Sequence, residues 1–380
     1  MIIKKHITRT LNKLYPKRCF VGNIFNEDND KSVLISYITF PFRNKKNISY
    51  HSNILESHVI AKLFKDLGFN VDVIQFDCDL GQVSGLQDNY DLIFGIEPNF
   101  IKLSEKYPKS KKIYYGTGAN CYFQNSAEEK RIEQLKERRG VKLARRRAVL
   151  EHKSSDLADS VILIGNDWTK STYKDHAKKV EAIHVSAASA FLGEEIIKNK
   201  KWRSASKKFL WFGSVGAVHK GLDLLLEIFP NHTNLDLYIC GAVEQEKDFV
   251  ELYRKELASP NVHLIGWIDP SSEKFKSIIE ECAFTILPSC SEGMSGSTAT
   301  CMHTGLIPLI SKETGVDVGQ AGVIFGQNNI SETEKVIVSM SKKSALELKV
   351  MAQGSMDLAK GNFTIERFEK DFRLALKKVL

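Results

Sequence analysis

The chain has 380 residues, of which 43% are hydrophobic and 26% charged, and its 54 Lys and Arg against 46 Asp and Glu give a net charge of +8. This length predicts two domains, and this composition excludes a disordered or fibrous chain. No apolar run approaches the ~20 residues that span a bilayer, and the first residues lack the apolar stretch of a signal peptide.

The first half alternates short β-branched runs with helical patterns. Apolar residues recur at helical spacing over residues 51–67, and Gly68 then predicts the end of a helix. Nearly continuous apolar runs are typical of strands in a parallel sheet that is covered on both faces. Such strands are expected at residues 32–38, 71–76, 90–95, 112–116, 160–165 and 180–186.

The second half resumes this alternation after a hydrophilic stretch, which we interpret as a linker. Two successive arrays predict an α/β protein of two doubly wound, Rossmann-like domains that face each other across a cleft. The expected parts are a first domain (1–193), a linker (194–207), a second domain (208–362) and a terminal helix (363–380). Strands of the second domain are expected at residues 209–213, 235–241, 262–266, 283–288, 306–311 and 322–325.

The positive charge is concentrated in two segments. Residues 1–18 carry +6 and residues 130–153 carry +7, which leaves −5 of the total of +8 for the rest of the chain. As a helix, the first segment would place Ile3, Ile7 and Leu11 opposite its cations, a layout typical of a membrane interface and also compatible with an ordinary surface helix. The second segment has no such face, so a solvated basic helix is the alternative there. Neither segment contains a nucleic-acid-binding motif. We therefore expect both segments to contact an anionic membrane surface and not nucleic acid.

The first strand of the second domain ends in Gly213-Ser-Val-Gly216-Ala-Val-His219-Lys220-Gly221. Glycines at a strand end allow a phosphate to approach the backbone, and a lysine at a helix start adds full positive charge. An ordinary helix start is the alternative interpretation.

A second cluster follows the strand that ends at Pro288. Glu292 lies on the loop, and the small residues 295–298 begin the next helix, where free amides favour anions. The alternative is a capped helix after a loop. Two phosphate-type sites at the strand ends of one domain strengthen the first interpretation.

Two further motifs join these clusters: Gly266-Trp267-Ile268 follows a strand, and Gly305-Leu-Ile-Pro308 precedes one. Taken in chain order, the four motifs resemble the donor half of GT-B glycosyltransferases. The pattern is most similar to the retaining enzymes of glycosyltransferase family 4, also called glycosyltransferase group 1. The resemblance covers about residues 207–326 and extends more loosely to the first half. It implies a nucleotide-sugar donor, no metal or other cofactor, and a terminal helix that returns to the first domain.

The resemblance also implies roles for individual residues. Lys220 would hold the donor diphosphate and Glu292 the sugar hydroxyls, while Trp267 and Ile268 fall where the family holds the nucleobase. The donor-binding set is then Gly213, Ser214, Gly216, His219, Lys220, Gly241, Trp267, Ile268, Glu292, Gly293, Met294, Ser295, Gly296, Ser297 and Thr300.

Two residues depart from the family's pattern. Ser214 stands where the family usually places an Arg on the diphosphate, so a second cation is missing unless one arrives from elsewhere or His219 is protonated. Thr300 stands where a second Glu usually binds the ribose, and its hydroxyl brings no charge.

The first domain is expected to bind the acceptor. Its candidates are His51, as a proton relay or a mere capping residue, and Arg43, Asn53, Gly116, Thr117 and Gly118 on loops at strand ends, with Glu97 as a further candidate. Asp77-Cys78-Asp79 is similar to the metal-binding Asp-x-Asp of GT-A glycosyltransferases, but it lies outside the half that resembles a donor domain. We therefore expect no metal.

The sequence thus predicts a glycosyltransferase that moves a sugar from a nucleotide sugar to a saccharide or lipid-linked acceptor in surface-polysaccharide synthesis, with retention. A nucleotide-sugar epimerase of the same fold and a catalytically silent binding partner are the alternatives. Seven scattered cysteines without Cys-x-x-Cys spacing argue against a disulfide framework or zinc ribbon. They predict a cytoplasmic enzyme, and the two basic segments predict a peripheral position on the inner face of the cell membrane.

Overall fold

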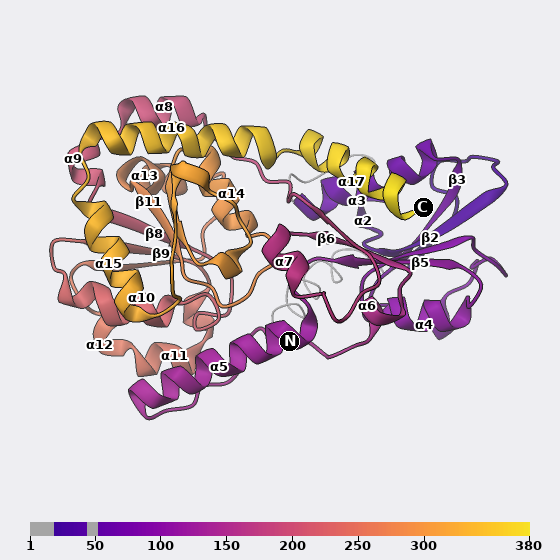
Figure 1. The fold of residues 1–380 in the computed structure, drawn as a ribbon, viewed down its shortest axis with the longest axis horizontal. Coiled ribbons are helices and arrows are strands. Elements are labelled where there is room, and N and C mark those ends of the chain that lie inside the picture. Colours follow the sequence, from indigo (N-terminus) through magenta and orange to yellow (C-terminus); the bar gives the residue numbers. More distant parts are fainter. Residues whose placement is uncertain (1–18, 44–51) are drawn as a thin grey trace. The chain divides into compact units, whose positions relative to one another are not determined.

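The computed structural model describes residues 19–43 and 52–380, which form two compact units (Figure 1). The first unit comprises the chain up to residue 120 with residues 151–186 and 365–380, and the second comprises residues 121–150 and 187–364. These units differ from the expected domains at one place above all. Residues 121–150, assigned to the first domain from the sequence, belong to the second unit.

The first unit is built on a seven-stranded sheet of order β1-β3-β2-β4-β5-β6-β7. All neighbours are parallel except β1 and β3. The predicted strands are confirmed, whereas the two-residue edge strand β1 is too short to show a period and was missed. The bounds are β1 Phe20–Val21, β2 Lys31–Tyr37, β3 Phe69–Gln75, β4 Leu92–Gly95, β5 Lys111–Gly116, β6 Ser160–Ile164 and β7 Val180–Ile183.

Helices cover this sheet, and the last one of the chain belongs here. Phe372 of the terminal helix lies against Phe94 and Tyr115 of the sheet, with ring centroids 5.7 and 6.0 Å apart. These apolar contacts hold the end of the chain in the first unit. The helices are α2 Phe40–Arg43, α3 Ser52–Asp66, α4 Asn99–Lys106, α6 Ser154–Leu157, α7 Asp167–Ser171, α17 Ile365–Val379 and the short 3-10 helix η1 Leu80–Gln82.

The second unit has a six-stranded, fully parallel sheet of order β10-β9-β8-β11-β12-β13. The chain builds outward from β8 through β9 to β10 and then returns to the other side of β8. Strands β8 and β11 are therefore neighbours at the point where the strand order reverses, which is where doubly wound sheets bind ligands. The bounds are β8 Lys208–Phe212, β9 Asp236–Cys240, β10 Val262–Gly266, β11 Phe284–Leu287, β12 Ile307–Ile310 and β13 Val323–Ile324.

The expected linker is wrong, because residues 194–207 contain two helices, α8 and α9, with buried Ile196, Ile197 and Ala205. One of the polar residues of this stretch, Lys200, is buried. Its ammonium donates to the carbonyls of Ile279 and Cys282. The helices of this unit are α5 Cys121–Arg139, α8 Gly193–Asn199, α9 Trp202–Ala205, α10 Leu222–Ile228, α11 Lys247–Leu252, α12 Arg254–Leu257, α13 Glu273–Glu281, α14 Gly296–His303, α15 Ile330–Ser341, α16 Ala345–Asn362, and the 3-10 helices η2 Phe229–Asn231, η3 Val243–Gln245, η4 Lys312–Thr314 and η5 Gly319–Ala321.

Helix α5 runs beside α11 and α12 (Figure 1) and carries much of the second basic segment. Arg138 pairs with fully buried Asp223 of α10 at 2.6 Å, and Arg139 pairs with Glu256 of α12 at 2.6 Å. This helix is therefore not the solvated basic helix that its charge suggested. Its arginines bind acidic side chains of its own unit.

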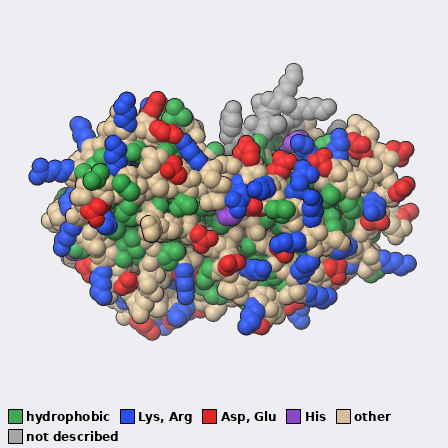
Figure 2. All heavy atoms as spheres, turned by 45° about the horizontal axis from the view of Figure 1, so that its top comes forward, with side chains coloured by type: hydrophobic (Ala, Val, Ile, Leu, Met, Phe, Trp, Pro, Cys, Tyr) green, Lys and Arg blue, Asp and Glu red, His purple; other side chains and the backbone are tan. Residues whose placement is uncertain are grey.

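The surface mixes charges of both signs. On the face drawn in Figure 2, Lys and Arg side chains alternate with Asp and Glu side chains.

Within the described residues, no helix is both long and apolar enough to cross a bilayer. All seven cysteines are free.

Candidate functional site

The loop after β8 folds into a tight turn that presents Lys220. Gly221 has φ of +71°, and a Cβ there would lie 2.2 Å from the carbonyl oxygen of Pro288. Only glycine fits this position without strain, because both its backbone conformation and the contact exclude a side chain. The indole Nε1 of Trp211 donates to the Lys220 carbonyl at 3.2 Å and fixes the turn to the core.

The loop after β11 presents Glu292. Its backbone N–H donates to the Glu313 carbonyl at 2.9 Å, and the Ser289 hydroxyl donates to its Oε1 at 3.1 Å. Three residues later Ser295 caps α14, its Oγ accepting from the Thr298 N–H at 3.3 Å. The capped helix that the sequence offered as an alternative is thus present, and it begins directly beside the carboxylate.

Because β8 and β11 are neighbours, the two loops meet, and Lys220 forms an ion pair with Glu292. The two side chains are only 6% and 13% exposed. Burial alone would raise the pKa of Glu292, but the Lys220 ammonium outweighs it and, with neighbouring positive groups, lowers that pKa to about 2. The site therefore holds a permanently ionised carboxylate against a cation.

His219 does not add a second cation here. It is buried, and its Nε2 donates to the Ser291 carbonyl between the two loops. Burial lowers the pKa of His219 to about 3, so the ring is neutral at physiological pH. The expectation that His219 might help by being protonated is therefore wrong, and the residue holds the two loops together instead.

The glycines of the predicted donor set serve close packing. A Cβ on Gly241 would lie 2.6 Å from the Gly213 carbonyl oxygen, so the ends of β8 and β9 approach closely there. The Gly216 amide donates to the Glu246 carboxylate at 2.6 Å. A contact of Gly216 with a donor would therefore not use this amide.

The residues after β10 differ in exposure. Trp267 is 73% exposed at the strand end, whereas Ile268 is buried against the core beside Phe275. An open indole suits stacking of a nucleobase. The buried Ile268 anchors the residue next to Trp267 in the core.

The remaining donor candidates surround α14 and the end of β8. Ser214 is exposed, Thr300 is half-buried on α14, and Ser297 shares a 3.1 Å contact with the Ser295 hydroxyl. Gly293 and Met294 are buried between Glu292 and the cap, and Gly296 is the first residue of the helix.

The first-unit candidates are held by local contacts. The Arg43 Nε donates to the Thr39 hydroxyl at 3.1 Å, and the Asn53 carbonyl accepts from Ser57 at 2.6 Å. Gly116 ends β5, and the Tyr173 hydroxyl donates to the Gly118 carbonyl at 2.9 Å beyond Thr117. His51 lies outside the described residues.

Two acids with raised pKa values stand out in the first unit, the buried Glu56 and the half-buried Glu97. Burial raises the pKa of Glu56 to about 7, although Ser186 donates to it at 2.9 Å. Burial likewise raises the pKa of Glu97 to about 7, and the Ser154 hydroxyl donates to it. Glu97 follows β4, where the strand order of the first sheet reverses, so its position after a strand makes it a candidate from the sequence alone. Nothing in the sequence showed that Glu56 is buried.

The Asp-x-Asp motif is used locally. Asp79 accepts from the Gly81 amide at 3.1 Å, and Asp77 accepts from the Gln75 amide at 3.0 Å. Among residues 19–43 and 52–380, no group of three or more His, Cys, Asp or Glu side chains is arranged to hold a metal ion.

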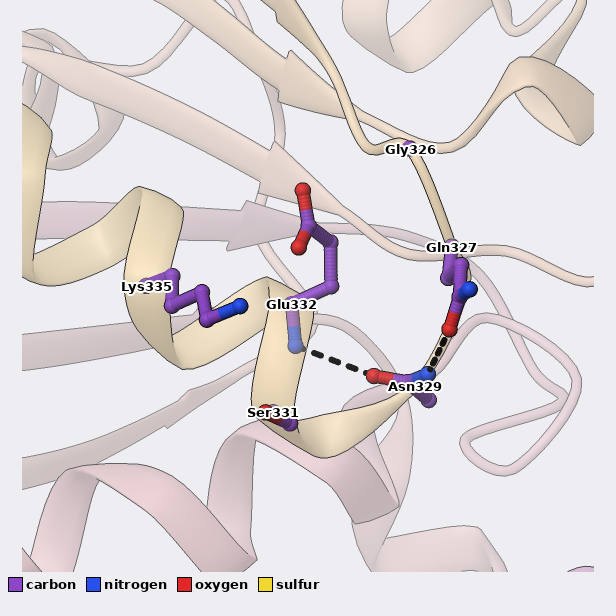
Figure 3. A pocket seen from close by; sticks show the side chains of 6 residues that line it. All are labelled: Gly326, Gln327, Asn329, Ser331, Glu332 and Lys335. Atoms are coloured by element: carbon purple, nitrogen blue, oxygen red, sulfur yellow. Dashed lines mark hydrogen bonds between the residues drawn. The ribbon is translucent and has the colours of Figure 1, made fainter.

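A separate hollow lies at the start of α15 (Figure 3), lined by Gly326, Gln327, Asn329, Ser331, Glu332 and Lys335. It contains none of the predicted site residues. Asn329 caps the helix by accepting from the Glu332 N–H at 2.9 Å. The adjacent Asn328 donates to the Ser289 carbonyl at 2.8 Å, which ties this loop to the Glu292 loop.

Residues 206–343 match the family model "Glycosyl transferases group 1". The second unit carries a glycosyltransferase group 1 domain. The match includes both site loops, Trp267 and α14, and with this domain the chain is a transferase enzyme. No curated protein matches the chain.

Solved structures show the same fold at low identity. Sucrose-phosphate synthase from Thermosynechococcus elongatus has a TM-score of 0.61 and 12% identity, covering 92% of this chain and 98% of its own. HepE from Anabaena, solved with UDP and glucose, has a TM-score of 0.58 and 12% identity, covering 91% of this chain and 99% of its own. A glycosyltransferase from Rickettsia africae has a TM-score of 0.58 and 10% identity, covering 92% of this chain and 99% of its own. The chain therefore has the GT-B fold.

Proposed function

We propose that this glycosyltransferase transfers a sugar from a nucleotide sugar to a saccharide or lipid-linked saccharide in the synthesis of a surface polysaccharide. The observation that carries the proposal is the buried Lys220–Glu292 pair at the reversal of strand order, inside the matched domain. Ligands of this chemical class occur in two similar structures. HepE was solved with UDP and glucose, and TarM of S. aureus with UDP and a GlcNAc-glycerol.

In this proposal Lys220 leaves Glu292 for the donor diphosphate and stabilises the charge that develops on the leaving group. The free amides at the start of α14 favour the same anion. Glu292 then accepts hydrogen bonds from sugar hydroxyls. In this role it orients the sugar without delivering a proton.

We propose retention because the second unit resembles retaining glycosyltransferases. In a retaining transfer the incoming hydroxyl approaches the face of the sugar that the leaving phosphate occupies, so this phosphate lies within reach of the hydroxyl's proton. We propose that it takes the acceptor's proton and that no metal is required, because Lys220 supplies charge to the diphosphate.

The test is sugar transfer by Lys220→Ala and Glu292→Gln, using a panel of radiolabelled nucleotide sugars with and without EDTA. Each variant should lower kcat by about 10²-fold or more, as loss of a charge-stabilising group typically does. Glu251→Gln, on the exposed surface of α11, is the matched control. Turnover within a few-fold of wild type in both site variants would refute the assignment.

A catalytically silent binding protein is the second candidate. The exposed Ser214 and the uncharged Thr300 favour it, because each replaces a charged group of the family's pattern. Tight nucleotide binding without turnover on any donor and acceptor would establish this alternative.

We also propose that the enzyme acts at the inner membrane surface, where a lipid-linked acceptor would lie. The +6 charge of residues 1–18, without a single acid, supports this. These residues lie outside the described part of the chain.

A further inference from the structure

A donor diphosphate carries two negative charges, and the loop after β8 supplies one cation for them. Ser214 is exposed and uncharged, and His219 is neutral. A second cation must come from another element if the leaving group is to be fully balanced.

The side chain of Arg147 runs into this loop. It follows α5 in the chain and passes over Gly216, where a Cβ would lie 2.6 Å from Arg147 Cγ and 3.0 Å from its Cδ. Gly216 also has φ of +103°, which favours glycine. The loop thus leaves room for the arginine stem.

Side chains of α5 hold the backbone at this position. Glu128 accepts from the amides of Arg146 and Arg147 at 2.9 and 2.8 Å. Asn125 and Val149 exchange two hydrogen bonds of 2.9 and 3.0 Å. Two bonds to consecutive residues and a reciprocal pair fix where the Arg147 side chain begins.

Among the residues that the structure describes, none forms a hydrogen bond with the Arg147 guanidinium. Its Nε is buried without a hydrogen bond, and the side chain forms no ion pair with any residue that the structure describes. The preceding Arg145 and Arg146, by contrast, contact Glu129 and Asp248. Arg147 is near enough to the site that its charge helps to lower the pKa of Glu292 and of His219.

We propose that Arg147 is the second cation of the donor diphosphate site, delivered from the segment after α5 in place of an arginine at Ser214. The inference rests on the proposed function. It also gives a reason for glycine at position 216, where a Cβ would collide with the Arg147 side chain.

The test is calorimetric binding of UDP, GDP and ADP, each compared with its monophosphate, to the full chain. Arg147→Ala should weaken binding of the preferred diphosphate about 10- to 100-fold, as loss of a hydrogen bond to a charged group does. The loss for the monophosphate should be smaller. Arg145→Ala, which removes a 39%-exposed cation two residues away, is the control and should leave both unchanged.

Rescue separates a binding role from a structural one. Ser214→Arg in the Arg147→Ala background should restore diphosphate binding to within a few-fold of wild type, and Arg147→Lys should retain part of it. Arg147→Lys, which keeps the charge and most of the side chain, also serves if Arg147→Ala folds poorly. Equal losses for mono- and diphosphate without rescue would overturn the proposal.

The outcomes distinguish the two proposals. If Lys220→Ala weakens diphosphate binding and Arg147→Ala does not, Arg147 is not the second cation, while the proposed function stands. If wild type binds none of the three diphosphates and transfers no sugar, both proposals fail.

Discussion

At the scale of single residues, the site depends on one ion pair between residues 72 positions apart. The sequence singled out Lys220 and Glu292 separately, each because of its place after a strand. It did not predict that they bind each other, because the contact depends on β8 and β11 being neighbours. It also could not show that His219 is buried, which decides that this ring is neutral.

The pair makes a prediction about pH. A carboxyl pKa lowered from 4.5 to about 2 stabilises the folded state above pH 4.5, and this contribution is lost as the pH falls through 2. In Lys220→Met the buried carboxylate has lost its partner, so its pKa rises and the ionised form destabilises the fold. The variant should lose about 3 kcal/mol of unfolding free energy at pH 7 and clearly less at pH 4.

Urea unfolding at the two pH values measures this difference. Lys343→Met, which breaks a pair with the half-exposed Glu347, should cost far less than Lys220→Met at pH 7, because solvent screens that pair. A loss for Lys220→Met that is the same at pH 4 and pH 7 would show that Glu292 titrates independently of the lysine.

At the scale of elements, long apolar runs were predictable and packing partners were not. The strands around each core appear in the sequence as continuous apolar runs, because a covered parallel sheet buries both faces. Helix α5 gave no such signal, since Asn125, Glu128 and Arg131 interrupt the apolar residues of its buried face. Arg131 is 3% exposed and lies 3.9 Å from Asp223, so a residue type usually found at the surface forms part of an interior network.

This network predicts a large cost for removing its acid. Asp223 is fully buried and faces both Arg131 and Arg138. Asp223→Asn keeps the volume but removes the carboxylate that faces Arg131 and leaves Arg138 paired with Glu227 alone. Breaking a buried pair on one side should lower the unfolding free energy by about 3–5 kcal/mol.

Urea unfolding followed by tryptophan fluorescence, to which buried Trp211 of the same unit contributes, measures the loss. The control is Glu251→Gln, because its carboxylate is 66% exposed and pairs with an exposed Arg254. That change should cost less than about 0.5 kcal/mol. Equal effects of the two substitutions would mean that α5 is not held by its charges.

At the scale of the whole molecule, many of the cations behind the net charge of +8 already form ion pairs within the second unit. Most of the basic residues 130–153 contact carboxylates of the second unit, as Arg138, Arg139, Lys142 and Arg146 do. A cation that already has a partner contributes less to binding a distant anionic surface. The sequence-based expectation of two membrane contacts therefore narrows to residues 1–18.

The last prediction follows from this narrower expectation. Deleting residues 1–18 removes six cations, each worth up to about 1 kcal/mol near an anionic bilayer. The deletion should abolish co-sedimentation with vesicles that contain phosphatidylserine. Replacing Lys130 and Lys153 with Ala should change it little. Wild-type binding should weaken as salt rises, because exposed charges are screened within about 8 Å at physiological ionic strength. Equal binding with and without residues 1–18, or none in either case, would show that the charge surplus is not a membrane contact.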